Sequence, residues 1–249
     1  MVDLVVVPPN SPTYKGLVKV IKSRGGRVFV VGDIHGDYEL FMEKLVEVDF
    51  DREVDLVISV GDLVDRNCAN EQVAKLLEED WFEAVLGNHE EFCIVGNYDK
   101  HIEDIHSNPR NGGAWFYKLG QDTRDEIVEG FSKMPLAIEI EVDGQLYGFT
   151  HADFPFTEWG DLYKTDDPNI DVYGRSLKDW LIWSRFGYDT KDSETQFING
   201  VRAVFHGHTP TRGKIEKRAN CIYVDFGACF GYGMCLVELG RACDVVGVE

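Results

Sequence analysis

The chain has 249 residues, and its 25 lysines and arginines against 44 aspartates and glutamates give a formal net charge of −19. This length suits one domain or at most two, and a hydrophobic content of 44% provides material for a large core, which excludes a disordered chain. A chain this negative repels nucleic acid and anionic membranes, so neither is expected as a partner. A phosphorylated substrate remains compatible with the charge, because bound metal cations can reverse the local electric field.

The N-terminal segment and the cysteines indicate the compartment. Residues 1–27 are expected to form an N-terminal extension that packs on a domain of residues 28–249. The first ten residues carry no basic stretch and no long apolar run, so we expect neither a signal peptide nor a membrane span. The six cysteines include no C-x-x-C pair, and a large core needs no disulfides, which predicts reduced thiols and a cytoplasmic protein.

The first half of the chain alternates strand and helix signals. Apolar, strand-like runs occupy Val28–Val31, Leu56–Val60 and Trp81–Leu86. Between them, Tyr38–Val48 and Asn70–Glu79 show the apolar spacing of helices. Strands that alternate with helices predict βαβ units and a partly parallel sheet.

The second half is predicted to become richer in strands. Residues 98–134 are polar with scattered aromatics and predict helices and loops, whereas Leu136–Val142 and Gln145–Thr150 flank an Asp-Gly pair, a strong hairpin signal. Residues 157–196 form an Asp-rich insertion around the amphipathic piece Leu177–Ser184, which we expect to shape the entrance to the site. Further strands are expected at Arg202–Phe205, Cys221–Asp225 and Met234–Leu239.

Polar residues follow the three strands of the first half. These strands end in the motifs Gly32-Asp33-Ile34-His35-Gly36, Gly61-Asp62-Leu63-Val64-Asp65-Arg66 and Gly87-Asn88-His89-Glu90. Ligand sites in open α/β sheets form at the carboxyl ends of strands. In an extended Asp-x-His, Asp33 and His35 point to the same side while Ile34 points to the core. One Gly-Asp pair is an ordinary turn, but three strand ends in succession indicate a site.

Histidines extend this pattern into the second half. His151 follows the strand that ends at Thr150, and His206-Gly207-His208-Thr209 follows another strand, so five of the seven histidines lie at strand ends. Core histidines explain one or two such placements. Carboxylate oxygens, imidazole nitrogens and an asparagine carbonyl suit Mn²⁺, Fe or Zn²⁺ in a two-metal site, and the lack of thiolates argues against structural zinc.

Together the motifs resemble a known family. GDIHG, GDLVDR, GNHE, the lone His151 and GHT occur in the order typical of the calcineurin-like metallophosphoesterases. Within that family the chain is most similar to the phosphoprotein phosphatase branch, in particular the bacteriophage lambda and bacterial Prp-type serine/threonine phosphatases. The resemblance runs from about Val28 to Leu239. It implies an α/β (α+β) fold, a β-sandwich of two mixed sheets flanked by helices in a single domain.

The resemblance also implies the activity and the metal ligands. The chain is expected to be a phosphoprotein phosphatase that hydrolyses phosphomonoesters of serine and threonine, with phosphotyrosine as a further substrate, by attack of a metal-bridging hydroxide. Two divalent ions are expected, Mn²⁺ first, with Fe and Zn²⁺ as alternatives. The implied ligands are Asp33, His35 and Asp62 for the first ion, and Asp62, Asn88, His151 and His208 for the second.

Further residues are implied to act on the substrate. His89, paired with Asp65, would donate a proton to the leaving group. Arg66, Arg185 and Asn88 would hold the phosphate. For Asp65 the alternative is a loop ion pair with Arg66, and for Arg185 it is a plain surface arginine.

Several positions leave alternatives open. His206 competes with His208 as a ligand, and we favour His208 because the family's histidine follows a glycine. Leu86 stands where lambda-like enzymes usually carry an arginine, so one phosphate contact is expected to be missing. Asn67 replaces the usual glycine and is expected to be a left-handed turn residue. Glu90 is expected in the first turn of a helix or as a hydrogen-bond acceptor beside the ligands.

The remaining candidates are expected to be structural. They are two histidines predicted to be solvated and two tryptophans predicted to lie in the core, namely His101, His106, Trp115 and Trp183.

Other functions in the same fold are less well matched. Symmetrical dinucleoside-tetraphosphate hydrolases share GDxHG but tend to lack the acid-pair aspartate and to carry GNHD. Nucleases and phosphodiesterases of the wider family usually have G-H-x-H, where this chain has Pro210. A non-catalytic phosphoprotein-binding module is expected to have lost a ligand or the acid, and none is missing. The acidic shell further predicts phosphopeptides with basic flanks.

Overall fold

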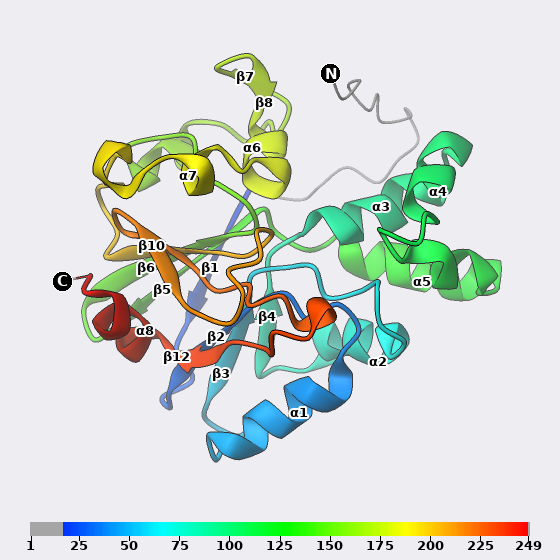
Figure 1. Cartoon of the computed structure of the whole chain (residues 1–249), viewed down its shortest axis with the longest axis horizontal. Helices are drawn as coiled ribbons and strands as arrows, with labels where there is room; N and C mark the ends of the chain where they lie inside the picture. Colours follow the sequence, from blue (N-terminus) through cyan, green and yellow to red (C-terminus); the bar gives the residue numbers. More distant parts are fainter. Residues whose placement is uncertain (1–16, 249) are drawn as a thin grey trace.

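Two mixed β-sheets pack face to face in the computed structural model, which describes residues 17–248. Residues 1–16 of the expected N-terminal extension lie outside the described residues. The larger sheet has the order β1 (Val18–Lys22), β5 (Ala137–Val142), β6 (Gln145–Thr150), β9 (Ala203–His206), β11 (Cys221–Tyr223) and β10 (Glu216–Arg218). The smaller sheet has the order β12 (Leu236–Glu238), β2 (Val28–Val31), β3 (Leu56–Ser59) and β4 (Phe82–Ala84) (Figure 1).

The core follows from the two-residue period of the strands. Successive strand residues point to opposite faces of a sheet. Val30 of β2 therefore packs between the sheets with Phe149 and Phe205. Its neighbour Val31 packs on the other face with Phe41 of α1 (Tyr38–Glu47). Helices thus cover the outer face of the smaller sheet, and the larger sheet packs against its inner face. This arrangement confirms the predicted sandwich of two mixed sheets flanked by helices.

The other helices form two groups. Helices α3 (Asn88–Gly96), α4 (Lys100–His106) and α5 (Gln121–Phe131) lie together on one side of the molecule (Figure 1). The insertion contributes η3 (Trp159–Lys164), the hairpin β7 (Asp171–Val172) and β8 (Arg175–Ser176), α6 (Leu177–Trp183), α7 (Phe186–Asp189) and η4 (Asp192–Glu194). The remaining helices are α2 (Asn70–Ala74), η1 (Lys75–Glu78), η2 (Gly113–Lys118), η5 (Ala228–Phe230) and α8 (Leu239–Val246). Across residues 17–248, no helix is both long and apolar enough to cross a membrane.

Most predicted elements are confirmed. The hairpin of β5 and β6 turns at Asp143 and Gly144, whose φ angles of 52° and 73° are the left-handed pair that a two-residue hairpin turn needs. The helix predicted over residues 70–79 is wrong as one element, because it becomes a 3-10 helix after Ala74. Strands β1 and β10 were not predicted, since both are short edge strands with exposed or half-buried residues. The C-terminal helix α8 was not predicted either.

Parallel pairing places the candidate residues at one edge of each sheet. Strands β2, β3 and β4 are parallel neighbours, so their carboxyl ends carry Asp33, Asp62 and Asn88 to a common edge. Strands β6, β9 and β11 are also parallel neighbours, and their ends carry His151 and His208. The two edges meet in one site.

Candidate metal centre

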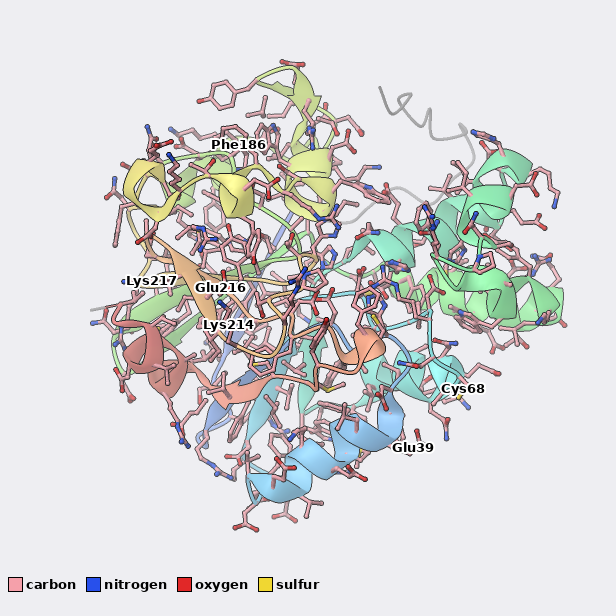
Figure 2. All side chains as sticks on the ribbon, in the orientation of Figure 1. Glu39, Cys68, Phe186, Lys214, Glu216 and Lys217 are labelled. Atoms are coloured by element: carbon pink, nitrogen blue, oxygen red, sulfur yellow. The ribbon has the colours of Figure 1, made fainter. Side chains whose placement is uncertain are left out.

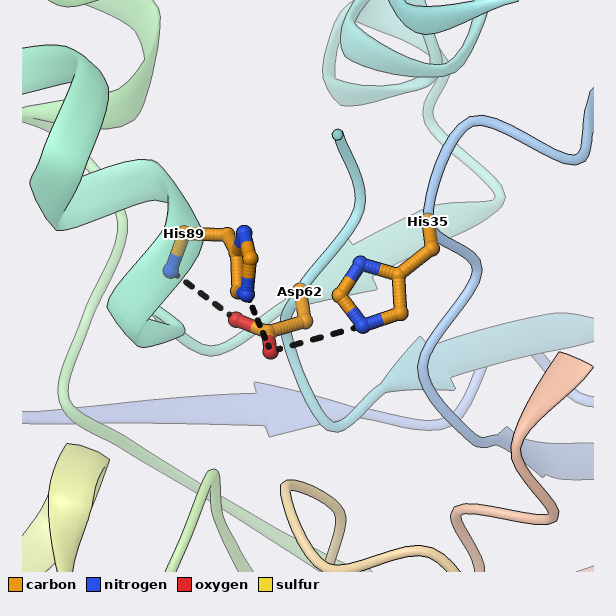
Figure 3. A group of neighbouring side chains, drawn as sticks. All are labelled: His35, Asp62 and His89. Atoms are coloured by element: carbon orange, nitrogen blue, oxygen red, sulfur yellow. Dashed lines mark hydrogen bonds and ion pairs between the residues drawn. The ribbon is translucent and has the colours of Figure 1, made fainter. Parts of the chain in front are cut away.

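Two clusters of buried ligand atoms share Asp62. The first contains His35, Asp62 and His89, and the second contains Asp62, His151 and His208, with the ligand atoms of each cluster within 4.8 Å of one another. Figure 3 shows the rings of His35 and His89 on either side of the Asp62 carboxylate. A carboxylate common to two clusters has the position that a bridge between two cations requires.

The two oxygens of Asp62 face different partners. Oδ2 lies 3.7 Å from Nε2 of His35 and 3.9 Å from Nε2 of His89, while Oδ1 lies 3.3 Å from Nε2 of His151. Oδ1 also accepts the backbone N–H of His89 at 3.0 Å. Burial opposes ionisation of Asp62, but the neighbouring imidazoles, His151 first, outweigh it and hold the pKa of this carboxyl well below its usual range.

Asp33 completes the first cluster. Its carboxylate accepts the backbone N–H of His208 at 3.1 and 3.2 Å, and its Oδ2 lies 3.9 Å from Nε2 of His35. This approach requires Gly207, because a Cβ there would lie 2.1 Å from Oδ1 of Asp33. Burial and the nearby carboxylates of Asp225 and Asp62 raise the pKa of Asp33 well above its usual value.

Backbone carbonyls orient two of the imidazoles. Nδ1 of His35 lies 2.9 Å from the carbonyl of Val64, and Nδ1 of His151 lies 2.7 Å from the carbonyl of Val60. A carbonyl only accepts, so Nδ1 of each ring carries a proton. The Nε2 of His35 accepts from Arg66 and so presents a lone pair at the centre. Burial and the neighbouring His89 and Arg66 lower the pKa of His35 to about 3, which keeps the ring neutral and able to bind a metal.

Asn88 and His208 join the second cluster, and His206 does not. Oδ1 of Asn88 lies 3.0 Å from Nε2 of His151 and 2.8 Å from Nδ1 of His208. Nε2 of His208 is buried and has no hydrogen-bond partner among the described residues. His206 instead bonds to Thr150 and stacks on Tyr223.

The extended Asp-x-His geometry expected at the first motif is wrong. Ile34 is buried as predicted, but His35 has a left-handed backbone with φ of 48°. The loops enforce this turn, since the backbone N–H groups of Ile34 and His35 both donate to the carbonyl of Asp62, and the N–H of Gly36 donates to Leu63. Asp33 and His35 therefore approach Asp62 through a turn.

The buried carboxylates provide a test of whether cations fit. Burial, followed by repulsion from Asp62, raises the pKa of Glu90 to about 7 and contributes to a pKa of about 6 for Asp225. Asp225, which the sequence analysis missed, extends the buried negative charge around Asp33. Excess buried carboxylates with an unpartnered imidazole nitrogen and no thiolate form a donor set that fits divalent cations.

Glu90 holds the loop that carries Asp62. Its carboxylate accepts the backbone N–H groups of Asp62 at 3.0 Å, Leu63 at 2.8 Å and Gly87 at 3.0 Å. Both alternatives predicted for Glu90 therefore hold, since it lies in the first turn of α3 and also acts as an acceptor beside the cluster. Its contacts fix the bridging residue to the helix that carries Asn88 and His89.

Asp65 accepts three side-chain hydrogen bonds. Oδ2 receives bonds from Nδ1 of His89 and Nε2 of His106, both at 2.6 Å, and Oδ1 receives one from Nε1 of Trp115 at 2.7 Å. Tyr117 contacts the far nitrogen of His106 at 2.9 Å. Burial opposes the charge on Asp65, but the bonds from His106 and His89 outweigh it and hold the pKa well below its usual range.

The expectation that His106 is solvated is therefore wrong. Its side chain is completely buried, and its ring stacks on Phe92 of α3 at 5.2 Å. The signal that could have found it is the i, i+4 spacing from Ile102, the other buried residue of α4. Trp115 is half-buried and packs against the core as predicted, and it also donates to Asp65. Trp183 donates to Glu91, and His101 is exposed as expected.

Arg66 contacts both histidines of the first cluster. Its guanidinium donates to Nε2 of His35 at 2.8 Å and to Nε2 of His89 at 3.1 Å, and it contacts Sγ of Cys229 at 3.3 Å. The non-glycine left-handed residues of this loop are Asp62, Asp65 and Arg66, with φ of 50°, 76° and 69°. The prediction of a left-handed Asn67 is therefore wrong.

The two remaining predicted positions differ in burial, since Arg185 is exposed and Leu86 is buried. Arg185 is exposed, and its Nη2 donates to the carbonyl of His208 at 3.3 Å, which places the guanidinium beside the second cluster. Leu86 is completely buried, and its backbone N–H donates to Pro135. No side chain from that position reaches the centre.

Comparisons with known proteins agree with this geometry. Residues 26–212 match the family described as calcineurin-like phosphoesterase. Serine/threonine-protein phosphatase 2 of Escherichia coli (strain K12) is 32% identical over 208 residues, which cover 81% of this chain and 87% of that protein. The symmetrical bis(5'-nucleosyl)-tetraphosphatase of Nitrosococcus oceani is 28% identical over 116 residues, which cover 44% of this chain and 38% of that protein.

A solved structure shares the fold. The protein serine/threonine phosphatase from Saccharomyces cerevisiae matches with a TM-score of 0.64 and 19% sequence identity, over 91% of this chain and 78% of that one.

Proposed function

This chain belongs to the calcineurin-like phosphoesterase family, and we propose that it is a metal-dependent serine/threonine protein phosphatase. The observation that carries the proposal is the buried pair of His89 and Asp65 beside the shared carboxylate of Asp62. Hydrolysis of a serine phosphate releases a poor alkoxide leaving group, which needs a proton donor. The pair provides one at the edge of the candidate metal centre.

Divalent cations are the cofactor, and we propose that two of them bind, with Mn²⁺ as the metal. The ligands would be Asp33, His35 and Asp62 for one ion, and Asp62, Asn88, His151 and His208 for the other. When bound, the ions supply Lewis acidity that acidifies a water molecule and neutralises the charge of the phosphate.

His89 is proposed as the acid because of how its two nitrogens are placed. Nδ1 is held by the carboxylate of Asp65, so Nε2 faces Asp62 and Arg66 at the centre. Once Arg66 donates to the phosphate in place of His89, a proton on Nε2 would point toward a leaving oxygen. His106 and Trp115 do not reach the centre; they hold the carboxylate of Asp65 and are positioning residues.

Arg66, Arg185 and Asn88 are proposed to hold the phosphate. The two guanidinium groups approach the centre from opposite clusters, Arg66 at His35 and His89, and Arg185 at His208. Guanidinium groups match phosphate oxygens with paired N–H donors.

The substrate is proposed to be a phosphoprotein in the cytoplasm. All six cysteines are free thiols, which suits a reducing compartment.

The experiment that tests the function compares two substrates. Phosphate release is measured from a phosphoserine peptide and from diadenosine tetraphosphate, after chelation and after Mn²⁺ is added back. We expect Mn²⁺ to restore turnover of the peptide with little turnover of the dinucleotide. The reverse preference would assign the chain to the symmetrical tetraphosphatases, whose matches cover 25–50% of it. Turnover of neither substrate in the metal-loaded protein would overturn the proposal.

A further inference from the structure

A groove opens beside the metal centre within the insertion. It encloses about 650 Å³ between the β7–β8 hairpin and the turn from α6 to α7. Its main lining side chains are Tyr173, Arg175, Trp180, Arg185, Phe186 and Asp189, and we call it the insertion groove. Arg185 links one end of the groove to the site, because its guanidinium also donates to the backbone carbonyl of His208.

Defined contacts hold the walls of the insertion groove. Nε1 of Trp180 donates to the carbonyl of Val172 at 2.7 Å, which ties α6 to the hairpin. At the other wall, the carboxylate of Asp153 accepts the Ser184 hydroxyl at 3.1 Å and the backbone N–H of Gly187 at 2.7 Å. The edge of Phe186 packs on Trp180 with ring centroids 5.9 Å apart. The groove is therefore bounded by two segments that hydrogen bonds fix in place.

The surface of the insertion groove is aromatic. Tyr173 is 81% exposed and Phe186 is 67% exposed, so two large rings face solvent at its rim. Figure 2 shows Phe186 on the face of the molecule that carries α6 and α7. Exposed aromatic rings in a concave site provide contact area for a bound chain.

The groove also gathers two arginines that form no close ion pair among the described residues, although Arg175 interacts at longer range with the buried carboxylate of Asp153. The arginines that form ion pairs within residues 17–248 are Arg24, Arg27, Arg202 and Arg218. Arg175 and Arg185 are not among them, although the chain has 44 acidic residues for 25 basic ones. The guanidinium of Arg175 lies over the ring of Trp180 at 5.4 Å, an arrangement that leaves its N–H edge available for a carboxylate. Asp189 is the one carboxylate of the lining.

We propose that the insertion groove binds the peptide segment beside the phosphorylated residue and selects an acidic side chain there through Arg175. This inference rests on the proposed phosphatase function. Arg185 marks the end of the groove at the centre, so a peptide whose phosphate reaches the metals continues past Trp180 and Phe186 toward Arg175. The proposed preference for an acidic flank is opposite to the preference for basic flanks that the net charge of −19 predicts. The contact with Arg175 should dominate, because it acts at short range while the distant surface charges are screened by salt.

The test uses three phosphoserine peptides that differ only in flanking glutamate, alanine or lysine. The readout is the ratio of kcat/KM values between peptides, which does not depend on the fraction of active enzyme. For the wild type we expect about a two- to fivefold advantage of glutamate over alanine, the range of an exposed ion pair. Arg175→Ala should abolish this advantage, and Arg175→Glu should reverse it in favour of lysine. Arg241→Glu, an exposed arginine of α8 outside the groove, is the matched control and should keep the wild-type ratios.

Three outcomes would overturn the proposal. Equal kcat/KM values for the wild type on all three peptides would remove the groove as a specificity site while the phosphatase function stands. A glutamate preference that persists in Arg175→Glu would assign the selection to another residue. Turnover of p-nitrophenyl phosphate with no turnover of any phosphopeptide would refute the proposed function and the groove proposal with it. Melting temperatures of the variants exclude misfolding as the cause.

Discussion

Replacing His106 by phenylalanine tests whether the bonds around Asp65 serve the proton donor. The substitution keeps a ring that can stack on Phe92 but removes the donor at 2.6 Å from Oδ2 of Asp65. A hydrogen bond to a charged group contributes about 1.5–3 kcal/mol. Because His89 and Trp115 still donate to Asp65, we expect a loss near the lower limit, about 1.5 kcal/mol, which corresponds to roughly tenfold in rate.

The assay compares a poor and a good leaving group. Loss of orientation at His89 should lower kcat/KM about tenfold on a phosphoserine peptide and much less on p-nitrophenyl phosphate, whose leaving group needs little protonation. His106→Gln, which keeps an N–H near the position of Nε2, should restore part of the loss. Tyr117→Phe removes only the bond at the far nitrogen of His106 and is the matched control, with a smaller effect.

Two results would refute this reasoning. Equal losses on both substrates would show that His106 affects folding or metal binding and not proton donation. A His106→Phe substitution that lowers the rate by the same factor in a His89→Asn background would show that it does not act through His89, because residues of one unit are not additive.

Three further predictions concern the bridge, the phosphate and the acid stability of the fold. Asp62→Asn should lower activity by more than about a hundredfold, beyond the effect of residues that only support ligands, and full metal content with full rate in this variant would refute the shared-ligand role. Arg185→Ala should lower kcat/KM by roughly 10- to 100-fold, the loss of a charge-assisted hydrogen bond, with unchanged kinetics returning Arg185 to a surface role. Asp55 is buried and accepts hydrogen bonds from Nη2 and the backbone N–H of Arg27, and these bonds outweigh the effect of burial and lower its pKa. The ionised Asp55 therefore stabilises the folded state fully above about pH 4. This contribution is lost as the pH falls through the lowered pKa of the folded state. Asp55→Asn should therefore cost about 2 kcal/mol at pH 7 in urea unfolding and less at pH 3, and a pH-independent difference would contradict the linkage.

The proposed metal ligands were accessible to sequence reasoning because each lies within a few residues of a strand end. Asp33, Asp62 and Asn88 stand one or more residues after apolar runs, and parallel pairing brings such strand ends to one edge. The family resemblance added the assignment of His151 and His208.

The supports of Asp65 were not accessible in the same way. His106 and Trp115 lie 41 and 50 residues further along the chain, and they reach the carboxylate only because α4 and η2 pack against α3. Asp225 was assigned to a strand, and nothing local indicates that its carboxylate faces Asp33. Tertiary packing, and not local pattern, places these groups.

The backbone turns at the site also depend on long-range bonds. The left-handed conformation of Asp65 is supported by the bond from its backbone N–H to Oδ1 of Asn70 at 2.7 Å. Gly112 permits the approach of the neighbouring loop, since a Cβ there would lie 2.4 Å from the backbone nitrogen of Arg66. The sequence motif around Asp65 does not contain Asn70 or Gly112. The left-handed turn was therefore predicted at Asn67, one or two residues away from its observed position at Asp65 and Arg66.

The most direct test of the account is a count of bound metal ions together with the activity that they restore. Chelated protein is titrated with Mn²⁺ while the ions bound per chain are measured by mass spectrometry of the metal and hydrolysis is followed with p-nitrophenyl phosphate. The account predicts about two ions per chain at saturation and a rate that rises with occupancy, because Asp62 contributes to both clusters. Saturation at one ion, or a hydrolysis rate that chelation leaves unchanged, would contradict it.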